Sequence, residues 1–544
     1  MDRLQDIFQK TIASIYNVDK EVIFTRTDND FGDFSTNVAM LLAKELKDNP
    51  RQIAQNIVDS IDEAKGIRNI EVAGPGFINL RVSDEILVDM ILVPKSDENT
   101  QTVVIETNNP NPFKSMHIGH GFNCVLADTI ANLLESSGAN THRVSYHGDV
   151  GLHVGKSMYS LLKFVEGDPS KLDTIPVNER NRFMSQMYAQ GSKVYKNDDS
   201  AKKEIDGLAK QSFILDDPIY KKVYETCREW SFEQIDDLVA RLGNKPTERR
   251  YLESQADNLG VETVRQHVGD VFIESEGAIL FPGSKYGSFD NVFVGSNGSG
   301  LYGARDLGLM QLKNRDYHPE KSYIVTAEEQ RDYFKGVIKA SELCLPNLQN
   351  TTVNIPTGTV KLTSGKMSSR DGDVLEVEWL FNQIKQALES HSSNDEAIIT
   401  GAIRYQFLKV KIGNDVVFDI QGATQLQGNT GPYLQYSYAR AYSILSKINE
   451  PTDTMLIDLE SNEHILLLKI SEYNEILEKA QKDLSPHILA NYTYELTQSF
   501  NSFYEKNRVI GDEREDQRVK LIGLYTRTLK KCLDILGIPV LEKM

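Results

Sequence analysis

The stretch that decides the fold is TVVIETNNPNPFKSMHIGHGF, residues 102–122. Its opening run of β-branched residues, 102–108, is typical of a buried strand. Pro110 and Pro112 exclude a regular helix from the loop that follows, and a helix opens near Gly119. The stretch therefore predicts a strand, a loop and a helix in direct succession.

The segments that follow predict a parallel sheet. The helix closes at Gly138, where glycine is favoured after a helix C-terminus, and the run at 141–146 predicts the next strand. A strand, a helix and a strand in this order imply a right-handed crossover between parallel strands. Much later, strands are expected at 322–330 and 351–358, on either side of a helix at 334–343.

The rest of the chain divides around this split sheet. We predict an α/β protein with a split Rossmann-like parallel-sheet domain at 98–400, interrupted by a helical insertion at about 157–268. A small N-terminal α/β domain is expected at 1–97. A C-terminal all-α bundle is expected at 401–544, because apolar residues recur there at helix spacing to the chain end.

Composition excludes several classes of protein. The chain has 544 residues, 40% hydrophobic and 25% charged, without an apolar run long enough to span a membrane or a signal-peptide core. Its net charge of −18 disfavours non-specific binding to polyanions, although a local basic surface could still bind nucleic acid. Four widely spaced cysteines argue against a disulfide framework or a cysteine zinc site, so we expect a cytoplasmic protein without a structural metal.

His117-Ile118-Gly119-His120 stands where the first strand passes into its helix. In an open α/β sheet, ligands bind at this edge, and a helix N-terminus attracts phosphate. Both histidines can donate to phosphate oxygens, and Gly119 leaves room for a flat base close to the backbone. The alternative is a pair of incidental surface histidines, and four residues alone do not decide between the two.

Lys366-Met367-Ser368-Ser369 lies between Gly365 and Gly372. A lysine and two hydroxyls on a loop suit a leaving pyrophosphate, whereas a solvated basic turn is the plainer interpretation of this motif alone. The pair of motifs, in this order and in separate halves of one split domain, is much more specific than either alone.

HIGH followed by KMSS resembles the class I aminoacyl-tRNA synthetases and, more narrowly, the arginyl-tRNA synthetase family. The resemblance covers nearly the whole chain. It is carried by GDFSTNVAMLLAKEL (32–46), IETNNPNPFKSMHIGHGF (105–122), YLESQ (251–255), GLYGARDLGL (300–309), TAEEQ (326–330), NTGPYLQYSYAR (429–440) and the last segments, YELTQSFNSFYEKNRVI (494–510) and LGIPVLEKM (536–544).

The resemblance implies a ligase that activates L-arginine with ATP and transfers it to tRNA(Arg). It implies that 1–97 is an additional tRNA-binding domain, 98–400 the catalytic domain and 401–544 the anticodon-binding domain. Mg²⁺ would enter with ATP, and we expect a monomer. The implied catalytic residues are His117, His120 and Lys366. The implied ATP-binding residues are Lys114, His117, Gly119, His120, Lys366, Met367, Ser368 and Ser369.

The resemblance also implies an arginine pocket, with carboxylates facing the five guanidinium donors. Asp306, Tyr302 and Glu253 would hold the guanidinium, Asn111 the α-amino group, and Gln330 would help position the amino acid. Glu106 and Asn109 match further pocket positions. Ser369 stands where the fuller KMSKS motif has its second lysine, and Arg370 follows, so Lys366, Arg370 or both could neutralise the leaving group.

Other interpretations remain open at this point. GSGLYG (298–303) satisfies the G-x-G-x-x-G pattern of dinucleotide-binding proteins, a weak match when it stands alone. A synthetase for another amino acid and a non-catalytic RNA-binding relative are the other two alternatives. In the C-terminal region, basic residues on a helix at 518–531 and aromatic residues at 492–504 suit RNA recognition, or else form a solvated face and a core.

Overall fold

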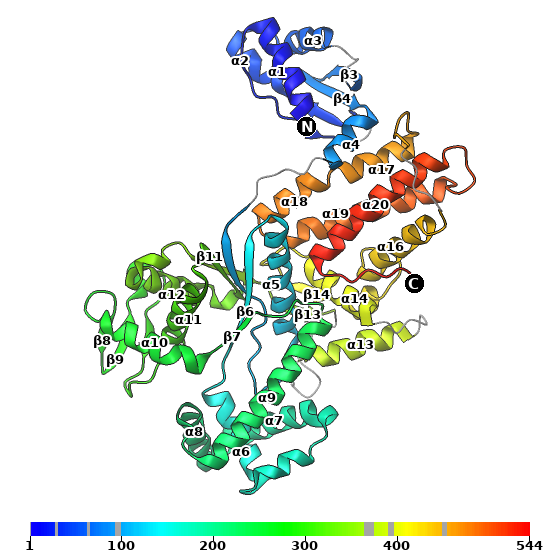
Figure 1. Cartoon of the computed structure of the whole chain (residues 1–544). Helices are drawn as coiled ribbons and strands as arrows, with labels where there is room; N and C mark the ends of the chain where they lie inside the picture. Colours follow the sequence, from blue (N-terminus) through cyan, green and yellow to red (C-terminus); the bar gives the residue numbers. More distant parts are fainter. Residues whose placement is uncertain are drawn as a thin grey trace.

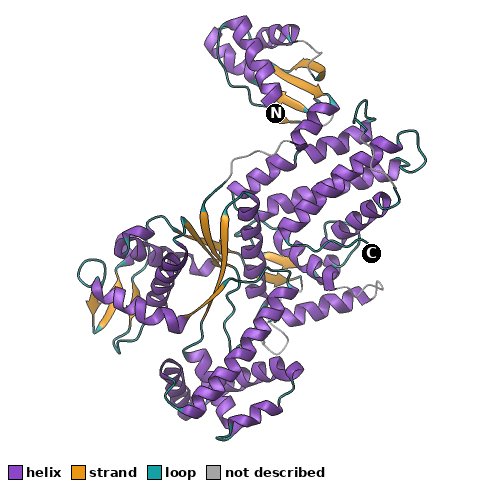
Figure 2. Cartoon of the chain, in the orientation of Figure 1, coloured by secondary structure: helices purple, strands orange, loops and turns teal. Residues whose placement is uncertain are grey.

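A computed structural model of the chain describes residues 2–27, 31–61, 66–92, 99–363, 375–389, 396–448 and 454–544. Figure 1 shows an N-terminal unit at one end of the molecule, a long helical bundle beside it, a central sheet, and two further lobes beyond the sheet. Figure 2 shows that helices make up most of the chain. Within the described ranges, every helix is too short or too polar to cross a membrane.

The N-terminal unit is an antiparallel sheet in the order β1-β2-β4-β3, covered by helices. Leu4, Phe8 and Ile12 on its first helix are fully buried, as their helical spacing predicts. Its elements are α1 (Asp2–Tyr16), β1 (Thr25–Arg26), β2 (Phe34–Thr36), α2 (Val38–Leu46), α3 (Pro50–Ser60), β3 (Ile67–Ala73), β4 (Phe77–Val82) and α4 (Asp84–Leu92).

The central sheet has five strands, all parallel, in the order β12-β11-β5-β6-β7. This is the doubly wound order, and its topological switch point lies between β5 and β11. The predicted strand–helix–strand unit is present, and Gly138 follows α5 with a φ of 93°, in the left-handed region that glycine adopts freely. Its elements are β5 (Thr102–Glu106), α5 (Ile118–Ser136), β6 (Asn140–His147), β7 (Arg249–Leu252), β11 (Lys321–Ala327), α12 (Arg331–Cys344) and β12 (Thr352–Thr357).

The helical segment between β6 and β7 is shorter than the sequence pattern indicates. It comprises α6 (Leu152–Val165), α7 (Arg180–Asn197), α8 (Asp199–Ile214) and α9 (Pro218–Arg241). Residues 249–252, which the pattern groups with these helices, instead form β7, the edge strand of the central sheet. The sequence of β7 is RRYL, and its two arginines hide the apolar signal of a strand, as is common for edge strands.

A second lobe interrupts the sheet between β7 and β11. Here α10 (Glu253–Gln266) packs against α11 (Tyr302–Tyr317). A small antiparallel sheet joins them, in the order β10-β9-β8, from β8 (Ile273–Ser275), β9 (Ala278–Phe281) and β10 (Asn291–Val294). The G-x-G-x-x-G match follows β10, which pairs only with antiparallel neighbours, so the parallel unit that a dinucleotide fingerprint requires is not formed there.

Within the described residues, the C-terminal part is helical apart from two short paired strands, and α5 packs against both the central sheet and this part. The regular apolar face at 466–484 is carried by two helices that meet at Glu472, which keeps helical angles (φ −73°, ψ −20°). The elements are β13 (Val360–Leu362), α13 (Val377–Glu389), α14 (Glu396–Leu408), β14 (Val416–Phe418), α15 (Ile420–Ala423), α16 (Gly431–Leu445), α17 (Ser461–Ser471), α18 (Tyr473–Lys482), α19 (Pro486–Lys506) and α20 (Glu515–Leu536).

Candidate active site

The loop between β5 and α5 is held in a strained conformation at Phe113. This residue has a φ of 65°, which is costly for a bulky side chain, and it is fully buried. Helices of the insertion fix it: its N–H donates to Ser231 Oγ at 3.1 Å, Ser157 Oγ donates to its carbonyl at 2.8 Å, and its ring stacks on Tyr224. The strain sets the direction of the next residue, Lys114, which is half-buried.

His117 and His120 lie together at the start of α5. Their rings stack with centroids 3.5 Å apart, and His117 Nδ1 caps the helix by accepting the His120 backbone N–H at 3.2 Å. Burial lowers the pKa of His117 to about 4, with a smaller contribution from the charge of Lys114, and burial holds the pKa of His120 well below its usual value. Both rings are therefore neutral at pH 7, and each can still donate one N–H to an anion.

His120 Nδ1 is buried, and no hydrogen-bond partner for it lies among the residues that the structure describes. A buried polar atom without a partner is rare and often marks a ligand site. The helix start adds a partial positive charge, and the charge of Lys114 lowers the pKa of both histidines, so Lys114 lies close to them. Four of the residues predicted to contact ATP, Lys114, His117, Gly119 and His120, thus lie within one short segment.

The predicted residues Lys366, Met367, Ser368 and Ser369 lie outside the described residues. The chain that follows them is bound to the histidine segment itself. Leu375 accepts the Ile118 N–H at 2.8 Å, and Val377 donates to the Met116 carbonyl at 2.9 Å. Leu375 is nine residues after Lys366 in the sequence. The segment that carries Lys366 therefore rejoins the described chain beside His117.

Glu106 and Asn109 are hydrogen-bonded to each other at the carboxyl end of β5. Glu106 is buried and pairs with Lys313 Nζ at 2.6 Å, while the Asn109 amide donates to its other oxygen at 2.7 Å. Asn109 Oδ1 also accepts the Tyr146 backbone N–H at 2.8 Å. Both residues that the resemblance places in the pocket thus have partners within the protein, and they connect the loop to β6 and α11.

Asn111 and Glu253 come together at Gly148. The Gly148 N–H donates to Asn111 Oδ1 at 2.8 Å. A Cβ atom at position 148 would lie 2.8 Å from Glu253 Oε1 and 3.2 Å from Asn111 Nδ2, so a larger residue there would displace the Glu253 carboxylate. The amide and the carboxylate therefore lie close to the same backbone point, although 142 positions of sequence separate them.

Arg305 pairs with the predicted pocket residue Glu253, although the sequence pattern does not identify it. Its Nη1 donates to Glu253 Oε2 at 2.9 Å, its Nε to Asp257 at 2.8 Å, and its Nη2 to the Gly300 carbonyl at 2.9 Å. Burial raises the pKa of Glu253, and the charge of Arg305 opposes that shift. Arg305 stands between Tyr302 and Asp306 in the sequence, but nothing local marks it, and its partners could not be predicted without the fold.

The pKa of Asp306 is strongly raised. Burial raises its pKa to about 7, the Tyr333 hydroxyl opposes this by donating to Oδ2 at 2.5 Å, and the charges of Glu106 and Glu253 raise the pKa further. Three carboxyl groups thus share one region, with Lys313 and Arg305 as their cations. A cationic ligand would relieve the remaining excess of negative charge.

Tyr302 and Gln330 are more exposed. Tyr302 begins α11 one turn before Asp306, and it is 67% exposed, with the Arg305 guanidinium 5.7 Å from its ring centre. Gln330 is exposed and ends a short 3-10 helix (Glu328–Gln330) directly after β11. Since β11 runs parallel to β5, Gln330 follows the same edge of the sheet as Glu106.

Several C-terminal residues that suit RNA recognition by their type are buried in the bundle. In the bundle, Tyr492, Phe500 and Phe503 are core residues, and Arg518 is buried and paired with Glu463 at 2.7 Å. The core interpretation therefore holds for these aromatic residues, and Arg518 is no part of a basic surface. Arg527 is exposed.

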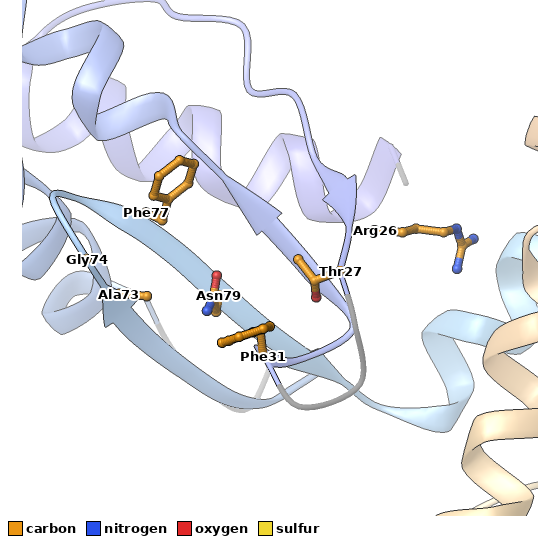
Figure 3. Close-up of a pocket in the computed structure, with 7 residues that line it drawn as sticks. All are labelled: Arg26, Thr27, Phe31, Ala73, Gly74, Phe77 and Asn79. Atoms are coloured by element: carbon orange, nitrogen blue, oxygen red, sulfur yellow. The ribbon is translucent and has the colours of Figure 1, made fainter.

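A hollow of about 540 Å³ opens on the N-terminal sheet. Its lining is Arg26, Thr27, Phe31, Ala73, Gly74, Phe77 and Asn79 (Figure 3). Phe31 and Phe77 are 60% and 39% exposed. Arg26 points away from the hollow toward the bundle, where it pairs with Glu475 of α18 at 3.0 Å. The hollow therefore combines exposed aromatic rings with an amide.

Family comparisons match the whole length of this architecture. A model described as the catalytic domain of class I (R) tRNA synthetases matches residues 82–420. Residues 2–82 match an arginyl tRNA synthetase N-terminal domain, and residues 434–544 match a DALR anticodon binding domain. The fold is also that of solved structures: the chain is similar to arginyl-tRNA synthetase from Thermus thermophilus (TM-score 0.76, 22% identity, all of both chains) and to that from Plasmodium falciparum (TM-score 0.75, 22% identity, 100% of this chain and 99% of that one).

Curated relatives agree with these matches. The chain is 29% identical to an arginine–tRNA ligase of a Picosynechococcus species over 94% of both chains, and 27% identical to one of Borrelia hermsii over 99% of both. The catalytic-domain model alone covers more than half of the chain. The chain belongs to the arginyl-tRNA synthetase family of class I tRNA synthetases.

Proposed function

We propose that this protein joins L-arginine to tRNA(Arg) in two steps. A carboxylate oxygen of arginine attacks the α-phosphorus of ATP, and the bond to the bridging oxygen breaks to release pyrophosphate. A ribose hydroxyl at the tRNA 3′ end, the 2′-hydroxyl by resemblance to class I, then attacks the carbonyl carbon of arginyl-adenylate and releases AMP. Transfer of this kind requires positioning and charge stabilisation more than covalent help from the protein.

The triphosphate would lie at the start of α5. His117 and His120 donate N–H groups to its oxygens, Lys114 adds positive charge, and Gly119 leaves the backbone accessible to the base. Lys366 and the hydroxyls of Ser368 and Ser369, with Met367 between them, would follow the leaving pyrophosphate. Mg²⁺ would enter bound to ATP and be held chiefly by phosphate oxygens. Support comes from the unpartnered His120 Nδ1 and from the backbone bonds between Leu375 and the histidine segment.

The observation that carries the proposal is the cluster of Glu106, Glu253 and Asp306 beside this helix start. Arginine has a planar guanidinium that is charged at every relevant pH, so ionised carboxylates are its natural partners. Asp306 and Glu253 would bind it with Tyr302 against its plane. Asn111 would bind the α-amino group. Gln330 would help position the amino acid from the end of β11, the strand next to β5. Glu106 and Asn109 would hold the loop that carries Asn111.

The transfer RNA would contact both ends of the chain. On the N-terminal sheet, exposed Phe31 and Phe77 with Asn79 form a hollow in which an unpaired base could stack and hydrogen-bond. We accordingly assign residues 1–97 to tRNA binding, 98–400 to catalysis and 401–544 to the anticodon. We further propose that the protein acts as a cytoplasmic monomer. Gel filtration of the free protein and of its complex with tRNA tests the oligomeric state.

The decisive experiment is charging of unfractionated tRNA, with ATP and Mg²⁺, by each labelled amino acid in turn. We expect arginine alone to be incorporated. Incorporation of another amino acid would instead support a synthetase of different specificity. Retained tRNA binding without any charging would support a non-catalytic RNA-binding protein. ATP–pyrophosphate exchange with and without tRNA then tests whether activation requires bound tRNA, as the family resemblance implies.

A further inference from the structure

Arg404 is a buried arginine far from the acidic pocket, in the middle of α14. Its side chain is fully buried, yet each of its five N–H donors has an acceptor. The acceptors are the Leu536 carbonyl at 2.7 Å, the Leu242 carbonyl at 2.9 Å, Asn244 Oδ1 at 2.8 Å, Asp128 Oδ2 at 3.1 Å and Thr129 Oγ1 at 3.0 Å. A guanidinium with every donor used fixes the relative positions of all the groups that it binds.

These acceptors belong to three separate parts of the molecule. Leu536 ends α20, the last helix of the C-terminal bundle. Leu242 and Asn244 follow α9, where the helical insertion returns to the sheet. Asp128 and Thr129 lie on α5, the helix that His117 caps. One side chain thus joins the bundle, the insertion and the helix that begins at the nucleotide site.

Two glycines pack closely around Arg404. Gly537 follows Leu536 with a φ of 67°, and a Cβ atom there would lie only 2.2 Å from Arg404 Nη2. Gly243 similarly lies against Gly537 and Thr400, with a φ of 78°. The end of α20 therefore rests directly on the guanidinium.

A further hydrogen bond leads from Arg404 toward the pocket. The Asn244 side chain accepts from Arg404 through Oδ1 and donates through Nδ2 to Asn108 Oδ1 at 2.9 Å. Asn108 and Asn244 are both buried. Asn108 directly precedes Asn109, which binds Glu106, and it is three residues before Asn111 beside Glu253. The path from bundle to pocket is therefore Leu536, Arg404, Asn244, Asn108 and the arginine-binding loop.

We propose that Arg404 is a positioning residue, and that the Asn244–Asn108 hydrogen bond transmits the position of the C-terminal bundle to the loop that carries Asn109 and Asn111. This rests on the proposed function, in which the bundle binds tRNA and the loop binds arginine. The orientation of the bundle on tRNA then sets the geometry of the pocket, which couples tRNA binding to the chemical step. If Arg404 held these parts together without influencing the loop, its hydrogen bonds would contribute to the stability of the protein and not to catalysis.

The Asn244–Asn108 bond can be tested without removing the buried arginine. In Asn244→Ala, Asn108→Ala and the double variant, we expect kcat for arginylation to fall roughly tenfold, with KM for tRNA within about twofold of wild type. Because both residues act through one bond, the double variant should lose no more than either single variant. Arg404→Lys, where it folds, should show the same loss of kcat.

Asn132→Ala is the matched control. Asn132 is equally buried and donates to the Ile535 carbonyl at 3.0 Å, on the same helix end, but its other bond is to Arg143 and not to the loop. We expect a similar fall in the thermal unfolding midpoint with kcat within about twofold of wild type. Wild-type kcat in Asn244→Ala, additive losses in the double variant, or an equal loss in Asn132→Ala would overturn the proposal. A wild-type protein that charges no arginine would overturn the proposed function instead.

Discussion

Arg305 Nη1 lies 2.9 Å from Glu253 Oε2, so one oxygen of this pocket carboxylate is already paired with a cation of the protein. The other oxygen, Oε1, is the one that approaches Gly148 and Asn111. A ligand would therefore meet Glu253 at Oε1. Asp306 receives a neutral hydroxyl from Tyr333, and its negative charge is the less compensated of the two.

Replacement of Asp306 should abolish most of the affinity for arginine. In Asp306→Ala we expect the Kd for arginine to rise about 100-fold or more while ATP binding is retained, because one partner of a desolvated charge pair is removed. Titration calorimetry with each ligand measures both values. Asp316→Ala is the control, since Asp316 lies on the same helix and also accepts from a tyrosine, Tyr251, at 2.6 Å. Unchanged arginine affinity in Asp306→Ala would mean that the pocket assignment is wrong.

The raised pKa of Asp306 predicts that arginine binding depends on pH. Below its pKa of about 7 the carboxyl group is neutral, and a guanidinium stays charged throughout. Binding must then ionise Asp306, so we expect arginine affinity to rise by up to about tenfold per pH unit below 7 and to level off above it. Asp306→Asn should remove this slope. A slope that persists in Asp306→Asn would assign the titration to another group.

Replacement of Lys366 tests the leaving-group role. We expect Lys366→Ala to lower the turnover number about 100-fold, the scale seen when one donor to a developing charge is removed. Arg370→Ala, measured in the same assay, shows which of the two cations dominates, because a loss confined to one variant identifies it. Arginylation by Lys366→Ala within a few-fold of wild type would remove Lys366 from the mechanism.

His464 links the bundle to the N-terminal unit through two carboxylates. Its ring nitrogens lie 2.8 Å from Asp84 and 3.1 Å from Asp33, across an interface where α4 packs on α17. Burial lowers the pKa of His464, but the hydrogen bonds and charges of both aspartates outweigh burial and raise it to about 9. The charged histidine stabilises this interface, on the order of 3 kcal/mol.

The sign of this shift sets the pH range of the prediction. Since the pKa is raised in the folded protein, the stabilisation is complete below the ordinary value of 6.5 and is lost as pH rises through about 9. We expect the protection of α4 amides against hydrogen exchange, corrected for the intrinsic rate at each pH, to fall over that range, and His464→Gln to show low protection at every pH. His142→Gln is the control, because His142 pairs with Glu248 away from this interface. Slow exchange in α4 of His464→Gln would contradict the prediction.

Local sequence patterns predicted most of the fold. The strand–loop–helix unit at 102–136, the helical bundle and the parallel sheet agree with the structure, because each depends on periodicity or on turn residues within a short window. The strand at 249–252 was missed because it is short, marginal and begins with two arginines. Apolar spacing alone would not locate the break at Glu472, because both helices continue one apolar face.

Pocket residues were predictable only in part. The resemblance named Asp306, Glu253 and Asn111, and the structure brings the last two together at Gly148. Their cations, Arg305 and Lys313, have no local signature, since an arginine or lysine on a helix is solvated by default.

The sequence by itself determined the strand–loop–helix unit at 102–136, the helical C-terminal part, the two motifs expected to bind nucleotide, and the family. Tertiary structure decided which charges meet: Arg305 with Glu253 across 52 positions, and Arg404 with Asp128 across 276. The physical reason is the separation along the chain over which each interaction acts. Backbone conformation responds to neighbours a few residues away, whereas the energy of a buried charge depends on partners that only the complete fold brings within hydrogen-bond distance.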